Sequence, residues 1–195
     1  MGDLNHIDKD RLGEVEGAIF DIGRRTITTL VGLQVGPAAG AAVGVALAAA
    51  YILYRKRKEL SSKGLRGEYK DLVEIRMKLN QLYARREELV KALEYAQRPS
   101  QRRMIMSSLE STDSMIRDLE EMLELQNIII EAKERIQTIL GEKNAREIDK
   151  IIKSIEKGEE PAETIYKLLA QVSERVMKTE KGIENLRIIL GGGYP

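Results

Sequence analysis

The pattern of polar and apolar positions changes abruptly at one stretch of the chain, residues 26–54, which holds no charged residue. Inside it, a glycine recurs at every fourth position, at Gly32, Gly36, Gly40 and Gly44. Ala48 continues this row of small residues. Residues four apart lie on one face of an α-helix, so this row would form a groove that a second helix could approach closely. Because about 20 apolar residues span a bilayer, this run of 29 predicts one glycine-zipper transmembrane helix. Pro37 predicts a kink near residues 35–36, since proline removes one helical hydrogen bond.

Outside this run, apolar residues recur at spacings of three and four, which predicts amphipathic helices. A first short helix is expected over residues 8–23, ending near Gly23. Beyond a basic linker, further helices are expected over residues 68–98, 101–140, 144–157 and 161–190. The apolar stripe on the second of these is wider than a two-stranded seam, which favours a bundle of three or more helices.

These elements predict an all-α fold: an N-terminal amphipathic helix, one glycine-zipper transmembrane helix, and a helical bundle or coiled-coil domain of about four helices. The expected segments are 1–25 for the first helix, 26–54 for the transmembrane helix, 55–67 for a basic juxtamembrane linker, 68–190 for the bundle, and 191–195 for a flexible tail.

Charge is distributed unevenly although the formal net charge is only +1. Residues 55–70 carry seven basic and two acidic side chains, and they begin with four cations: Arg55, Lys56, Arg57 and Lys58. Positive flanks remain on the cytoplasmic side and contact anionic lipid headgroups. We therefore expect a single-pass membrane protein whose C-terminal domain is cytoplasmic or interior, in a cell or virion membrane. Nucleic-acid binding by this basic block is the disfavoured alternative.

Candidate catalytic chemistry is sparse. The chain has no cysteine and a single histidine, His6, so neither a thiolate metal site nor a histidine pair can form. Neighbouring carboxylates such as Glu87 and Glu88 point about 100° apart on a helix and do not converge on one atom. We expect no enzyme activity, no cofactor, no metal site and no small-molecule substrate.

The leading functional hypothesis is a non-enzymatic membrane protein that self-associates through the glycine row and presents a helical scaffold for assembly of an envelope or virion. A homo-oligomer is expected, and a helical protein is a further candidate partner. One alternative is a membrane-active protein of the pore, holin or fusion kind, which would exist in a soluble state before insertion. Another is a soluble helical adaptor that buries residues 26–54 as its core helix, which would require apolar surface all around that segment.

Overall fold

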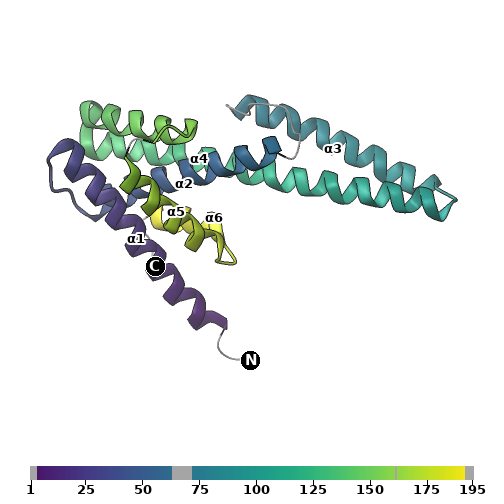
Figure 1. The fold of residues 1–195 in the computed structure, drawn as a ribbon, viewed down its shortest axis with the longest axis horizontal. Coiled ribbons are helices and arrows are strands. Elements are labelled where there is room, and N and C mark those ends of the chain that lie inside the picture. Colours follow the sequence, from purple (N-terminus) through teal and green to yellow (C-terminus); the bar gives the residue numbers. More distant parts are fainter. Residues whose placement is uncertain (1–3, 63–71, 161, 192–195) are drawn as a thin grey trace. The chain divides into compact units, whose positions relative to one another are not determined.

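The computed structural model describes residues 4–62, 72–160 and 162–191, and every regular element in these ranges is a helix (Figure 1). The helices are α1 (Leu4–Val31), α2 (Pro37–Ser62), α3 (Leu72–Tyr95), α4 (Pro99–Lys157), α5 (Glu163–Met177) and α6 (Gly182–Gly191). The predicted all-α class is confirmed, whereas the coiled-coil geometry stays a prediction. Part of the expected basic linker and of the C-terminal tail, residues 63–67 and 192–195, lies outside the described residues, as does Pro161.

The chain divides into two compact units. Unit 1 contains Met1–Lys58 and Leu125–Pro195, and unit 2 contains Glu59–Glu124. The apolar part of α2 therefore belongs to the same unit as α1, the second part of α4, α5 and α6. This grouping differs from the expected order of a separate membrane helix followed by one bundle domain.

The expectation of one continuous helix over residues 26–54 is wrong. Helix α1 runs to Val31, α2 begins at Pro37, and residues 32–36 connect them. Gly32 has a φ of 66°, and its N–H donates to the Thr28 carbonyl at 3.1 Å, so it caps α1 in the left-handed conformation that glycine adopts at low cost. Pro37 then occupies the first position of α2, where its missing N–H is not needed. The glycine and the proline together separate two helices instead of kinking one.

The expected end of the first helix near Gly23 is also wrong, because α1 continues for two more turns. Helix α1 contacts α5, and α5 contacts α6. Within unit 1, every residue of the range 42–50 on α2 is buried. Every helix of unit 1 contributes fully buried large side chains, which include Ile19, Ile27, Leu47, Ile52, Leu53, Leu125, Ile128, Ile136, Leu169 and Leu186. Helix α2 is thus the centre of this core.

Two glycines interrupt or end α4, and they stand directly after the helices expected over 101–140 and 144–157. Gly141 has non-helical angles, φ 76° and ψ 164°, and it divides α4 into two helical segments. At the end of α4, the Gly158 N–H donates to the Ile155 carbonyl and the Glu159 N–H donates to the Ser154 carbonyl. These two bonds form a Schellman cap, and the φ of 74° at Gly158 suits glycine.

The expectation of a single last helix over residues 161–190 is wrong, because α5 and α6 are separate. The Thr179 hydroxyl donates to the Val176 carbonyl at 2.8 Å, and the Asn185 amide donates to the Thr179 hydroxyl at 2.8 Å. Both side chains are buried. Local bonds of this kind compete with helical ones, so Thr179 closes the first helix and holds the turn to the second.

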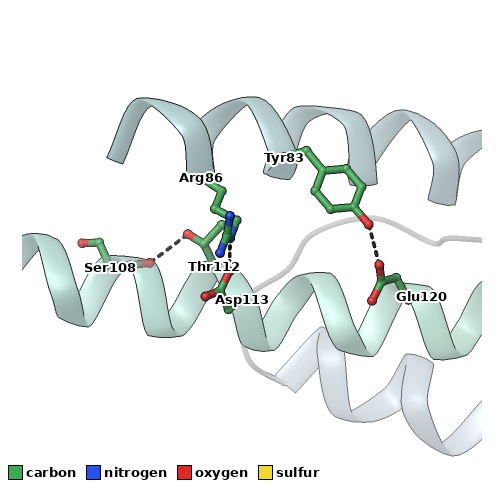
Figure 2. Close-up of polar contacts among 6 residues, drawn as sticks. All are labelled: Tyr83, Arg86, Ser108, Thr112, Asp113 and Glu120. Atoms are coloured by element: carbon green, nitrogen blue, oxygen red, sulfur yellow. Dashed lines mark hydrogen bonds and ion pairs between the residues drawn. The ribbon is translucent and has the colours of Figure 1, made fainter. Parts of the chain in front are cut away.

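Unit 2 is a hairpin of α3 and the first part of α4, residues 99–124 (Figure 1). Its core residues are Leu60, which lies near the end of α2, and Ile75, Leu79, Leu82, Ile116, Leu119 and Met122. Figure 2 shows two polar contacts beside this core: the Tyr83 hydroxyl donates to Glu120 at 2.5 Å, and Arg86 Nε donates to Asp113 Oδ1 at 2.7 Å. Arg86 breaks the apolar heptad of α3, and its ion pair accounts for a charge at that place.

Candidate interaction surfaces

Glycines bring α1 and the first turns of α2 into close contact within unit 1. A Cβ on Gly23 would lie 1.8 Å from the Gly40 carbonyl oxygen, and a Cβ on Gly44 would lie 2.0 Å from the Ile19 carbonyl oxygen. Distances this short leave no space for any side chain, so the two backbones touch. Gly40 itself faces the ring of Phe20, with its ideal Cβ position 2.9 Å from the nearest ring carbon.

The structure brings only part of the predicted glycine row together on a helix. Gly40, Gly44 and Ala48 are buried on α2, whereas Gly32 and Gly36 are exposed in the segment between α1 and α2. Sequence reasoning misses the partner of the row, Gly23, because a glycine near the end of an apolar periodicity also has the pattern of a helix stop. Self-association through the row stays a prediction, but its buried members already contact α1 of the same chain.

The other end of the buried part of α2 carries an aromatic cluster. The rings of Tyr51 and Tyr166 meet edge to face with centroids 5.2 Å apart, and Tyr54 lies 6.4 Å from Tyr166. A Cβ on Gly158 would lie 2.4 Å from the Tyr54 ring, so the cap of α4 also packs against α2. Burial, followed by the neighbouring Tyr54 and Tyr51, raises the pKa of the Tyr166 hydroxyl to about 12. The cluster thus fixes α2 to α4 and α5.

The basic block follows this cluster at the end of α2. Arg55 and Lys58 are exposed, while Lys56 and Arg57 are half-buried and interact with other groups. Arg55 also acts on α5: the pKa of Glu174 is lowered mainly by its hydrogen bond from Lys178 and further by the charge of Arg55. Part of the block is therefore engaged within the protein, and its contact with lipid headgroups stays a prediction.

Two apolar surfaces lie outside the residues selected from the sequence. A groove of about 790 Å³ runs along α1, α2 and α6, and its lining includes Leu12, Phe20, Ala41, Ile188 and Ile189. A shallower hollow of about 400 Å³ lies at the turn between α3 and α4. The sequence signal for the second was a charge imbalance, since residues 95–109 contain three arginines and neither Asp nor Glu.

In the ranges 4–62, 72–160 and 162–191, no three His, Cys, Asp or Glu side chains gather in a group that could hold an ion. Comparisons with protein-family models, with curated proteins and with solved structures found no match for this chain.

Proposed function

We propose that this protein is a helical binding scaffold in which α2 is the core helix of unit 1 and the α3–α4 hairpin of unit 2 presents a binding surface. The observation that carries this proposal is the burial of α2. By length and composition α2 could cross a bilayer, yet 78% of its most apolar 18-residue window is buried within the protein. Folding of the chain on itself therefore already provides the apolar surroundings that a bilayer would otherwise supply.

The cover of α2 comes from several directions in unit 1, which supports a folded state without lipid. Glycines on α1 and α2 allow backbone contact on one side. Tyr166 of α5 and the cap at Gly158 of α4 meet the tyrosines near the end of α2. Each large apolar side chain removed from water in this way contributes about 1.5–3 kcal/mol to the free energy of folding. Moving α2 into a bilayer would therefore remove a substantial part of the core of unit 1.

Fractionation of two versions of the chain tests the scaffold proposal. The full chain should remain in the supernatant after an alkaline wash and ultracentrifugation. A version lacking residues 1–58 should aggregate or lose cooperative unfolding, because it lacks the core helix of unit 1. A membrane-anchored bundle behaves in the opposite way: the full chain would need detergent for recovery, and the truncated version would be soluble and folded. That result would overturn the scaffold proposal in favour of a single-pass, self-associating membrane protein.

Conditional insertion into a membrane is the second candidate function. It is favoured by the uncharged end of α1 and the connection that follows it, where Leu30 and Leu33 are 43% and 48% exposed beside a helix long enough to span a bilayer. A soluble full chain that releases dye from vesicles of anionic lipid would support insertion. Intact vesicles over a range of pH and protein concentration would leave the scaffold as the function.

A further inference from the structure

The end of the α3–α4 hairpin exposes apolar side chains that a folded domain normally buries. Among the described large hydrophobic residues, Tyr95 at 81% and Met104 at 73% have the highest exposed fractions. They border the hollow of about 400 Å³ at the turn, which is lined by Ala92, Tyr95, Ala96, Gln101, Met104 and Ile105. The two alanines are short, so the hollow can accept a side chain from outside.

The same end of the hairpin carries uncompensated positive charge. Arg98, Arg102 and Arg103 lie in residues 95–109, which contain no acidic residue. All three are exposed, and within the described ranges none forms an ion pair. Elsewhere on the hairpin, by contrast, Arg86 pairs with Asp113 and Lys91 pairs with Glu87. We call Tyr95, Met104 and these three arginines the hairpin tip.

We propose that the hairpin tip is a docking surface for an acidic segment of a partner protein that inserts an apolar side chain into the hollow. Tyrosine, methionine and arginine are enriched at protein interfaces, and the planar guanidinium group matches a carboxylate with two parallel hydrogen bonds. An anionic bilayer would attract the three arginines, but it offers no side chain to fill a hollow that is lined by two alanines. This inference rests on the proposed scaffold function and specifies the chemistry of its partner.

A defined acidic polymer can test the tip without a known partner. Fluorescently labelled poly(Glu,Tyr), which combines carboxylates with an apolar ring, is titrated with the full chain and followed by anisotropy. The wild-type protein should bind it more tightly than poly(Glu), and binding should weaken as salt is raised because charge contributes to it. Replacing Tyr95→Ser together with Met104→Ser should abolish the preference for poly(Glu,Tyr).

Charge-matched variants locate the binding to the tip. The tip variant carries Arg98→Gln, Arg102→Gln and Arg103→Gln. The control removes the same charge from the middle of α3 through Arg76→Gln, Lys78→Gln and Arg85→Gln. We expect at least a tenfold loss of affinity for the tip variant, from about 1.4 kcal/mol or more of lost interaction, and less than a twofold change for the control.

Three outcomes would overturn the proposal. The first is no binding of poly(Glu,Tyr) by the wild-type protein, and the second is an equal loss of affinity in the tip and control variants. The third is binding to vesicles of 70% phosphatidylcholine and 30% phosphatidylserine that the tip variant weakens more than it weakens polymer binding. The last result would assign the tip to a membrane. Solubility and circular dichroism of each variant show whether the protein is still folded and helical. A soluble, helical protein that does not bind the polymer refutes the docking surface but leaves the scaffold proposal intact.

Discussion

Gly23 shows most directly how one residue controls the packing of unit 1. An added methyl group would meet the Gly40 carbonyl oxygen at 1.8 Å, so α1 and α2 would have to separate. We expect Gly23→Ala to destabilise the protein by about 1–3 kcal/mol or more, the usual cost of overpacking. Gly17 on the same helix provides the control, because its Cβ position has nothing within 4 Å. There the same change should stabilise by about 0.5–1 kcal/mol, as urea unfolding can measure, and equal effects at both sites would refute the contact.

Tyr166 predicts how the stability of unit 1 depends on alkaline pH. Its pKa is raised to about 12, mainly by burial and further by the neighbouring tyrosines. The folded state therefore keeps the hydroxyl proton up to a higher pH than the unfolded state does. The stability associated with this proton is complete below the ordinary tyrosine pKa of about 10 and is lost as pH rises toward 12. Unfolding free energies of the wild type and Tyr166→Phe, measured from pH 8 to 11, should diverge above pH 9.5. Parallel curves would contradict the assignment.

At the scale of elements, the break of α4 at Gly141 is held by a charged cluster. Asp149 lies after the break and forms ion pairs with Lys133, before the break, at 2.7 Å and with Lys153 at 2.6 Å. Burial alone would raise the pKa of Asp149, but the hydrogen bonds from both lysines outweigh it and leave this pKa lowered. The cluster therefore stabilises the fold above the ordinary aspartate pKa, and its contribution disappears as pH falls through the lowered value.

Replacing Asp149→Asn should cost up to about 1 kcal/mol at pH 7, since the ion pairs are partly solvated. The difference from the wild type should shrink as the pH is lowered toward 2. Glu147→Gln is a suitable control, because Glu147 forms a local ion pair with Lys150 on the same helical segment. Thermal unfolding across this pH range measures both, and a larger cost for Glu147→Gln would show that the pair across the break is unimportant.

At the scale of the whole molecule, the two units differ in how completely they bury their apolar residues. Residues 42–50 of α2 are all buried, whereas Val73 and Met77 on α3 are 64% and 60% exposed. Regions with few buried contacts open at lower free energy. We expect amides of α2 to exchange with deuterium more slowly than those of α3, as mass spectrometry of peptides can measure. Faster exchange in α2 would contradict its place as the core helix.

Local rules of the chain predicted several elements correctly. The helices expected over 68–98, 101–140 and 144–157 stop directly before Pro99, Gly141 and Gly158, and these three residues limit helices in the structure, because glycine admits a positive φ and proline suits a first helical turn. The same reasoning failed at Thr179, where the helix ends through hydrogen bonds of a residue that also fits an apolar seam. Side-chain hydrogen bonds of this kind depend on a neighbour six residues away, and the spacing of apolar residues does not reveal them.

By itself, the sequence determined that the protein is helical, that helices are limited beside Pro99, Gly141 and Gly158, and that residues 37–54 of α2 carry no charge. These properties depend on residues within one or two turns of each other. Only the tertiary structure decided that Gly40 and Gly44 meet Gly23 and Ile19, that α2 is covered by its own chain, and that Tyr95 and Met104 remain uncovered. Burial depends on which distant segments fold against one another, and an apolar helix has the same composition whether protein or lipid surrounds it.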